Sequence, residues 1–257
     1  MTWSIVARDE TTGAFGIAIA SKAFAVGALC PHLRAGVGAI ATQSLTNPYL
    51  GIWGLGLIES GMSATEAIEA LIEADVGSPV RQIHAIDAQG RNTAFSGEDC
   101  IDWAGHRIAD GVSVAGNMLA APAVVDATLS TYLAHRERPL PERLLRAMDA
   151  GDQAGGDKRG RQSAAVRVVS REDYADLDIR VDDNADPIRE LWRLYDVAHE
   201  RFLPRRPFMA TREDPAGLCS FAALDEAVEE RKRTEPAPDF SAFWQRPVRE
   251  GSEGEGS

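Results

Sequence analysis

The sequence predicts an α+β fold in which helices cover both outer faces of two stacked, mainly antiparallel sheets. Blocks of apolar, strand-like runs alternate with pairs of helix-like segments, and this alternation occurs twice before residue 203. With 257 residues and 44% hydrophobic content, the chain can bury one large core without a second domain. We therefore expect one domain over residues 2–203, followed by a C-terminal extension over residues 204–257.

The strands are predicted from short apolar runs bounded by turn residues. The expected strands are residues 2–7, 14–21, 25–29, 36–41, 111–115, 163–170 and 177–181, with a hairpin over residues 80–96 that turns at residues 88–90. No internal repeat is evident in this series.

The helices are predicted from apolar residues at helical spacing and from capping signals. Ser63 can cap one helix, and Glu66 three residues later completes a capping box. The expected helices are residues 49–60, the segment capped by Ser63, and residues 122–134, 141–150 and 187–202. In the extension, residues 221–233 could form one helix, and residues 250–257 form a Gly/Ser/Glu tail that is expected to be disordered. The extension could lie over the core or over a partner subunit.

The charge and the composition argue against several classes of function. A formal net charge of -12 is poorly suited to nucleic acids or anionic membranes, so small molecules or other proteins are the expected partners. No secretion signal and no apolar run long enough to span a membrane is evident, which predicts a cytoplasmic protein. The three cysteines form no CxxC pair and the five histidines show no metal-ligand spacing. We therefore expect no metal and no other cofactor.

Thr2 is the candidate nucleophile. Threonine is small enough that an aminopeptidase is expected to remove Met1, which would leave a hydroxyl and a free α-amine on one residue. As the first residue of a predicted strand, Thr2 would be held at the rim of a sheet rather than on a fraying tail. The alternative is an ordinary residue at the start of a strand.

A glycine-rich basic turn, residues 154–163, lies between a predicted helix and a predicted strand. It lacks the Gly-Lys-Ser/Thr ending of a phosphate-binding loop. In the functional interpretation, Asp157 is directed toward a reacting group, and the adjacent cations hold an anionic part of the substrate. Those cations are Lys158, Arg159 and Arg161. In the alternative interpretation, the segment is a solvated basic turn.

Two further groups of polar residues could take part in catalysis. Residues 41–48 follow a predicted strand and precede a helix, where backbone N–H groups and amide side chains could form an oxyanion hole. The candidates in this segment are Thr42, Gln43, Ser44 and Asn47. Asn117 is a lone polar residue at the end of an apolar strand. An ordinary strand-to-helix turn, and a capping or turn role for Asn117, are the alternatives.

Together these residues resemble the family catalogued as domain of unknown function 1028, which is assigned to the N-terminal nucleophile (Ntn) hydrolase superfamily. The resemblance covers about residues 2–201 and rests on residues 2–9, 20–28, 35–39, 41–43, 116–119, 155–163 and 177–183. It implies a four-layer αββα sandwich, with a Thr, Ser or Cys nucleophile that begins a strand. It also implies hydrolysis of an amide bond through an acyl-enzyme.

The resemblance also implies roles for individual residues. Thr2 matches the nucleophile of the superfamily. Ser21 ends the second strand, where proteasome-like relatives carry an acidic residue, and Lys22 is adjacent to it. Asn117 falls where those relatives have a polar residue near the amine of the nucleophile, and Asp157 falls where they place a carboxylate. Asp9 is the rival carboxylate, but its turn is expected at the far end of the first strand.

The expected function is that of an amidohydrolase, an enzyme acting on carbon–nitrogen bonds. It would cleave a small linear amide, such as an N-acyl or carbamoyl amino acid or a short peptide, through a Thr2 acyl-enzyme. One alternative is a catalytically silent scaffold that binds an anionic small molecule through Lys158, Arg159 and Arg161. Another is an interaction protein that acts through the extension over residues 204–257. We also expect a homo-oligomer, specifically a dimer.

Overall fold

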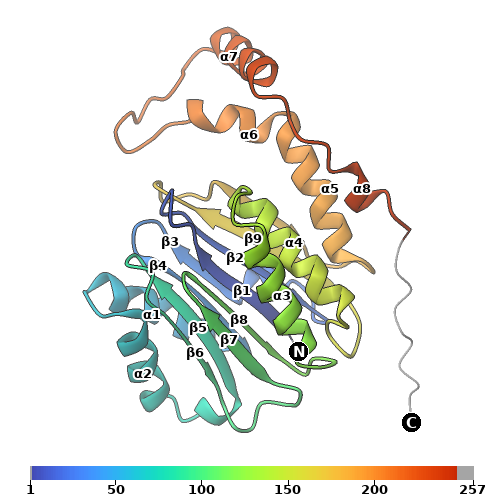
Figure 1. Ribbon diagram of the computed structural model, residues 1–257. Helices are drawn as coiled ribbons and strands as arrows, with labels where there is room; N and C mark the ends of the chain where they lie inside the picture. The colour runs from blue at the N-terminus through green and yellow to red at the C-terminus, as the bar shows by residue number, and fades with distance from the viewer. Residues whose placement is uncertain (1, 248–257) are drawn as a thin grey trace.

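The structure, a computed structural model, describes residues 2–247, which form two antiparallel sheets (Figure 1). The six-stranded sheet has the order β10 (Leu177–Val181), β9 (Ser163–Val169), β2 (Phe15–Ser21), β1 (Thr2–Arg8), β8 (Val112–Asn117) and β7 (Gly105–Ala109). The four-stranded sheet has the order β3 (Pro31–Arg34), β4 (Gly38–Ser44), β5 (Arg81–Asp87) and β6 (Asn92–Ser96). Each pair of neighbouring strands runs antiparallel.

Helices cover the outer face of each sheet, so the fold is a four-layer αββα sandwich. The helices on the four-stranded sheet are α1 (Pro48–Glu59) and α2 (Ala64–Ala74). The helices on the six-stranded sheet are α3 (Ala123–Ala134), α4 (Leu140–Gln153) and α5 (Pro187–Glu200). The predicted α+β class and the stacking of two sheets between helices are confirmed.

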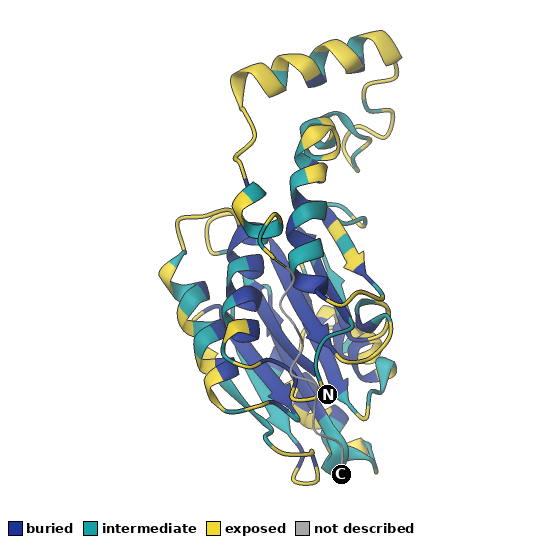
Figure 2. Ribbon diagram, turned by 90° about the vertical axis from the view of Figure 1, so that its right-hand side faces the viewer, coloured by how far each residue is buried: buried dark blue, intermediate teal, exposed yellow. Residues whose placement is uncertain are grey.

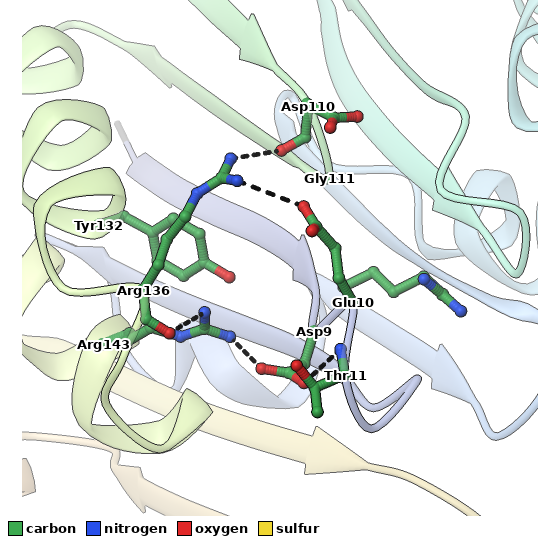
Figure 3. Close-up of a pocket in the computed structure, with 9 residues that line it drawn as sticks. Asp9, Glu10, Thr11, Asp110, Gly111, Tyr132, Arg136 and Arg143 are labelled. Atoms are coloured by element: carbon green, nitrogen blue, oxygen red, sulfur yellow. Dashed lines mark hydrogen bonds and ion pairs between the residues drawn. The ribbon is translucent and has the colours of Figure 1, made fainter.

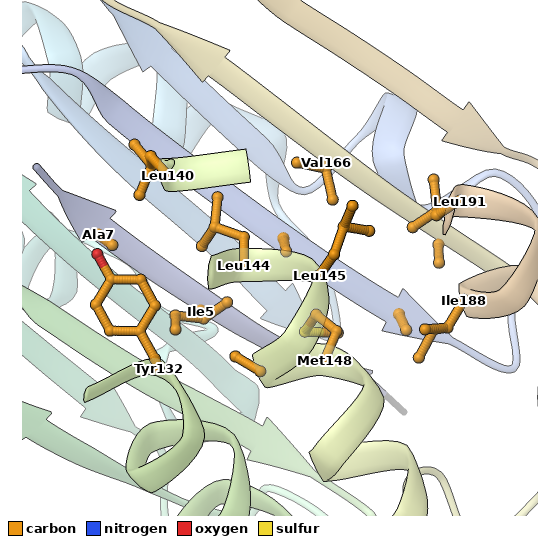
Figure 4. Close-up of a cluster of buried hydrophobic side chains, with 14 of the residues drawn as sticks. Ile5, Ala7, Tyr132, Leu140, Leu144, Leu145, Met148, Val166, Ile188 and Leu191 are labelled. Carbon is orange, nitrogen blue, oxygen red and sulfur yellow. The ribbon is translucent and has the colours of Figure 1, made fainter. Parts of the chain in front are cut away.

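Strand β1 lies inside the six-stranded sheet, and its two faces contribute to two different interiors. Ile5 packs with Leu144 and Met148 of α4 in the core between sheet and helices (Figure 4). Val6, the next residue, packs with Ala39 and other apolar residues of the facing sheet. This alternation follows from the period of two in a strand, because neighbouring side chains point to opposite faces. Thr2 and Ser4 have the same parity as Val6, so they belong to the face that meets the other sheet.

One predicted strand is wrong, and the strands β3 and β7 were not predicted. Residues 25–29 were expected to form a strand, but Val26–Ala28 forms a 3-10 turn, and the strand β3 begins at Pro31. Ala25 has a left-handed backbone (φ 53°), which ends extended structure there. Strand β7 was not predicted, because its residues are only partly buried or exposed and the sequence Gly-His-Arg-Ile-Ala shows no clear alternation. The other predicted strands and helices are confirmed, with shifted ends.

The C-terminal extension contains the helices α6 (Phe202–Arg205), α7 (Phe221–Thr234) and α8 (Ser241–Trp244). Helix α7 stands away from the sandwich (Figure 2) and confirms the helix expected near residues 221–233. The chain then returns to the core, where the Phe243 ring stacks on Trp192 with centroids 4.1 Å apart. Arg246 adds an ion pair with Asp149 of α4. The tail expected to be disordered, residues 250–257, lies outside the described residues.

Within residues 2–247, no helix is both long and apolar enough to cross a bilayer.

The capping box of α2 provides a test of how local sequence signals stabilise this fold. The Glu66 backbone N–H donates to the Ser63 hydroxyl at 3.2 Å, and the Ser63 backbone N–H donates to the Glu66 carboxylate at 2.8 Å. We predict that Ser63→Ala lowers the free energy of unfolding by about 1 kcal/mol, measured by urea denaturation. Ser130→Ala, an exposed change inside α3, should alter it by less than about 0.5 kcal/mol. Equal effects of the two substitutions would contradict the stabilising role of the cap.

Candidate functional site

The candidate nucleophile lies at the first position of β1, between β2 and β8. Its register partners are Ser21 on β2 and Asn117 on β8. The Thr2 hydroxyl donates to the Ser21 hydroxyl at 3.1 Å, and Thr2 is 6% exposed. The structure thus places three of the four predicted catalytic residues side by side at one end of the six-stranded sheet.

Two side-chain amides hold the backbone of Thr2. The Asn117 and Gln43 amides both donate to the Thr2 carbonyl oxygen, each at 3.4 Å. Gln43 lies on β4 of the other sheet, so this contact also crosses the space between the sheets. Gln43 donates further to Gln82 at 2.8 Å and to the Ala115 carbonyl at 3.2 Å. Among the predicted oxyanion residues, Gln43 is therefore the one with a direct contact to Thr2.

A layer of buried polar side chains continues from this contact into the interior. The Ser4 hydroxyl donates to Gln43 at 2.7 Å, and its oxygen lies 2.7 Å from His84 Nε2. His84 Nδ1 lies 2.8 Å from the Ser113 hydroxyl. Because the Ser4 hydroxyl donates to Gln43, its oxygen is left to accept a hydrogen bond from His84. His84 therefore carries its proton on Nε2, and its Nδ1 accepts from the Ser113 hydroxyl. Ser4, His84 and Ser113 are fully buried.

Sequence reasoning did not single out Gln82, His84 or Ser113 as functional or structural residues. The available signal was alternation in β5, where Gln82 and His84 alternate with the apolar residues Ile83 and Ala85. Such a pattern indicates a polar face, and it usually predicts exposure to solvent. Here that face is buried against the other sheet, and only the arrangement of the two sheets reveals it.

Burial sets the protonation state of His84. Desolvation and, to a smaller extent, the charge of His106 lower the pKa of His84 to about 3, although a hydrogen bond with Ser113 acts in the opposite direction. The imidazole is therefore neutral at physiological pH and can act as both donor and acceptor within the layer.

Asp157 contacts the loop that follows Ser21. Its carboxylate accepts from the Lys22 backbone N–H at 2.8 Å and from the Arg159 backbone N–H at 2.8 Å. Within residues 2–247 these bonds hold the loop, and none of them goes to Thr2. Asp157 is thus placed to position the Ser21–Lys22 segment beside the candidate nucleophile.

The cations of the basic turn already have acceptors within the protein. Lys158 Nζ donates to the Asp102 carbonyl at 2.8 Å. Arg161 forms an ion pair with Asp152 at 2.7 Å. Arg159 forms one with Asp157 at 3.3 Å and keeps 42% of its side chain exposed. The positive charges expected to hold an anionic substrate are therefore largely engaged in fixing the turn.

The remaining predicted oxyanion residues act mainly at the entrance to α1. The Thr42 backbone N–H donates to the Cys30 carbonyl at 3.1 Å, and its hydroxyl donates to the Asn47 carbonyl at 3.2 Å. Asn47 caps α1 by accepting from the Tyr49 N–H at 3.1 Å. These contacts fit the alternative of an ordinary strand-to-helix turn, and an oxyanion role for Thr42 and Asn47 stays a prediction. Ser44 ends β4 with a left-handed backbone, φ 72°.

Asp9 lies at the far end of β1 from Thr2, as predicted from the sequence. Arg8 pairs with Phe15 at the β1–β2 turn, whereas Thr2 pairs with Ser21 at the opposite end. Asp9 forms an ion pair with Arg143 of α4, so it does not belong to the Thr2 site. Within residues 2–247, no group of three or more His, Cys, Asp or Glu side chains could hold a metal ion.

Comparison with known proteins identifies the family. Residues 2–191 match the model described as "Family of unknown function (DUF1028)". The chain belongs to this family. The crystal structure of protein SPO2555 from Silicibacter pomeroyi, of the same family, is 28% identical with a TM-score of 0.78, covering 84% of this chain and 94% of that chain. This confirms the resemblance to the family, while assignment to the Ntn superfamily stays a prediction.

A second solved structure is much less similar. Anbu (ancestral beta-subunit) from Yersinia bercovieri is 12% identical with a TM-score of 0.37, covering 76% of this chain and 95% of that chain. A similarity of this size carries no argument about fold or activity. A search of curated proteins found no match.

The buried imidazole predicts a dependence of stability on pH. An unfolded histidine has a pKa of about 6.5, whereas folded His84 has a pKa of about 3, so the unfolded state binds the proton first as pH falls. We predict that His84 makes the folded state about 2 kcal/mol less stable at pH 5 than at pH 7. Urea denaturation of the wild type and of His84→Gln at both pH values should show a smaller loss in the variant. His135→Gln, at the end of α3, should keep the wild-type loss.

A positioning role for Asp157 predicts a local effect of its removal. In Asp157→Asn, one carboxylate oxygen becomes an amide donor that faces backbone donors. We expect a loss of about 1–3 kcal/mol in unfolding free energy and faster hydrogen exchange at the Lys22 amide. Asp183→Asn is the control, because Asp183 accepts from Gln162 on the exposed side of the same region. Unchanged exchange at Lys22 would show that Asp157 does not hold this segment.

Proposed function

We propose that the protein is an amidohydrolase of the N-terminal nucleophile type, which cleaves a small linear amide through a Thr2 acyl-enzyme. The observation that carries the proposal is the environment of Thr2. Its hydroxyl is hydrogen-bonded to the Ser21 hydroxyl at 3.1 Å, and its carbonyl oxygen accepts hydrogen bonds from Gln43 and Asn117. A hydroxyl at the end of an inner strand, with a fixed backbone, is the arrangement that a nucleophile on the first residue of a processed chain requires.

The proposed reaction begins at the α-amine that Thr2 carries once Met1 is removed. A reference pKa of about 7.7–8.0 leaves a usable fraction of the amine neutral near pH 7, so it can accept the hydroxyl proton. The Thr2 Oγ then bonds to the substrate carbonyl carbon, and the carbon–nitrogen bond breaks as the amine returns the proton to the leaving nitrogen. Attack by water on the resulting ester releases the acid and restores the Thr2 hydroxyl.

Other predicted residues support this proposed chemistry as positioning groups. Ser21 accepts the hydrogen bond of the Thr2 hydroxyl and orients it, in the position where an acidic residue was expected from the resemblance. Asp157 holds the Lys22 backbone, and through it the end of β2. Since the Thr42 donors are used within the fold, Ser44 at the end of β4 and the side-chain amide of Asn47 are the remaining candidates for oxyanion donors from that segment.

The surroundings of Thr2 favour a substrate with an apolar group. Phe24 follows Ser21 by three residues, and Leu45 follows Gln43 by two. The Ile101 carbonyl accepts from the backbone N–H of Met118, the residue after Asn117. These three apolar side chains are 69%, 64% and 55% exposed, respectively. Exposed apolar side chains on the segments next to the neighbours of Thr2 favour a substrate with an apolar group.

The apolar side chains and the engaged cations together favour an amide substrate over the small anion of the scaffold alternative. The scaffold alternative requires Lys158, Arg159 and Arg161 to hold an anionic molecule, yet Lys158 and Arg161 already bond to Asp102 and Asp152. An N-acyl amino acid or short peptide with an apolar side chain therefore fits the site better than a small anion.

The proposal predicts that hydrolysis depends on the Thr2 hydroxyl. In a screen of N-acyl amino acids and short peptides, Thr2→Ala should lower kcat by more than about a thousandfold, while its unfolding transition stays close to that of the wild type. Thr2→Ser keeps a hydroxyl and an amine and should keep part of the activity. Thr93→Ala in β6 is the control and should leave turnover unchanged.

Mass spectrometry supplies the decisive companion measurement. The active protein should lack Met1, and incubation with an ester substrate should add one acyl group to the peptide that begins with Thr2. Full hydrolysis by a protein that retains Met1, or by Thr2→Ala, would overturn the assignment of the nucleophile.

A further inference from the structure

A second polar site lies at the opposite end of β1 from Thr2. A cavity of about 160 Å³ is enclosed by the β1–β2 turn, the β7–β8 turn and the segment that joins α3 to α4 (Figure 3). Its walls carry Asp9 and Glu10 from the first turn, Tyr132 from α3, Arg136 from the connection and Arg143 from α4. The mechanism proposed for Thr2 uses none of these residues.

The carboxylate nearest α4 is already satisfied. One Asp9 oxygen accepts from the backbone N–H groups of Thr11 and Thr12, at 3.1 Å and 2.8 Å. The other oxygen accepts from Arg143, whose side chain is 6% exposed. Although desolvation by itself would raise it, these hydrogen bonds and the Arg143 charge lower the pKa of Asp9. Asp9 is therefore ionised and paired, so it leaves little unmatched negative charge in the cavity.

Glu10 and Arg136 form the outer wall, and they are paired with each other as Asp9 is with Arg143. Arg136 donates to the Glu10 carboxylate at 3.3 Å and to the Asp110 carbonyl at 3.1 Å. The Arg136 side chain is 45% exposed, so further N–H groups of its guanidinium can turn toward a ligand. Each guanidinium has five N–H donors, and these two bonds use only part of them.

Tyr132 provides the observation that indicates a ligand. The residue is 3% exposed, and its hydroxyl points into the cavity (Figure 3). Within residues 2–247, this hydroxyl takes part in no hydrogen bond, and its oxygen stays accessible from the cavity. Burial raises the pKa of Tyr132 to about 12, so the phenol stays protonated at neutral pH. It therefore offers an unused O–H donor beside two guanidinium groups.

We propose that this cavity binds a small oxyanion, a carboxylate or phosphate group, which accepts hydrogen bonds from Tyr132, Arg136 and Arg143. Asp9 and Glu10 are already paired with Arg143 and Arg136, whereas the unused donors are the Tyr132 hydroxyl and the remaining guanidinium N–H groups. An oxyanion is the ligand that accepts from several donors at once. A cationic ligand would face the Arg136 and Arg143 charges. The volume of about 160 Å³ admits a group of this size but not a large molecule.

Occupation of the cavity would join α3 to α4 through the segment between them. Tyr132 belongs to α3, Arg136 to the connecting segment and Arg143 to α4. A ligand that bonds to these three elements binds only the folded state, so it stabilises the protein by mass action. This inference does not depend on the function proposed for Thr2, because it concerns the far end of the hairpin.

Isothermal titration calorimetry with two probes, inorganic phosphate and acetate, tests the inference. Chloride at matched ionic strength is the reference, because it adds the same screening without planar or tetrahedral oxygen acceptors. Thermal unfolding with the same probes should show a rise in Tm that follows the binding curve. We expect saturable binding of at least one oxyanion that chloride does not reproduce.

Tyr132→Phe is the decisive variant, since it removes one oxygen and keeps the ring that packs under Arg143. We expect it to weaken oxyanion binding by about tenfold or more, because one hydrogen bond to a charged acceptor is lost. Tyr195→Phe is the matched control, because Tyr195 is also 3% exposed but packs against Trp192 and Phe240 instead. Arg136→Gln is a second variant on the exposed wall and should weaken binding independently.

The outcomes separate the possible ligands. Binding of phosphate alone, of acetate alone or of both, weakened by Tyr132→Phe and not by Tyr195→Phe, supports the site and names the chemical group. The proposal is overturned if neither oxyanion binds beyond the chloride reference, or if Tyr132→Phe binds as the wild type does. The cavity would then hold solvent only.

Discussion

The hydrogen bonds between the two sheets are the interaction on which the rest of this structure depends. The fully buried side chain of Gln43 forms hydrogen bonds with Ser4 and Gln82 and with the carbonyls of Thr2 and Ala115. Apolar contacts between sheets tolerate small sliding movements, whereas directional bonds among buried groups do not, because each unmatched group would cost about 1–3 kcal/mol. The layer therefore selects one register of sheet on sheet. That register fixes the carbonyl of Thr2 and, with it, the direction of the Thr2 hydroxyl.

The β1–β2 hairpin carries two chemically different ends. At one end, Thr2 lies between Ser21 and Asn117. At the other end, Asp9 lies in a cavity of guanidinium and carboxylate groups. The strands between these ends are buried on both faces, as their near-continuous apolar sequence indicates. The hairpin thus holds the Thr2 site and the charged cavity at opposite ends of the same two strands.

Much of the fold could be predicted, because its signals are local. The capping box at Ser63 and the alternation that marks the hairpin over residues 80–96 depend on residues a few positions apart. The site was predicted in part: Thr2, Ser21 and Asn117 do meet, but the bond from Lys22 to Asp157 joins residues 135 positions apart. No local pattern specifies such a pairing. For the same reason the sequence could not distinguish a polar strand face that meets water from one that meets another sheet.

The buried layer also contains a pair that looks more like a catalytic couple than Thr2 does. The Ser4 Oγ and His84 Nε2 atoms lie 2.7 Å apart, and Ser113 bonds to the other ring nitrogen. A catalytic triad has the same parts, namely a nucleophile, a base and a group that orients the base. Three facts exclude that role: the Ser4 proton is directed to Gln43, both residues are fully buried, and burial lowers the pKa of His84 to about 3. A base that weak does not take a hydroxyl proton at neutral pH. Two residues earlier, at the first position of the same strand, Thr2 is 6% exposed, and the proposed removal of Met1 would give it an amine of its own. The position of a hydroxyl along β1, more than the quality of its hydrogen bonds, therefore decides which one can meet a substrate.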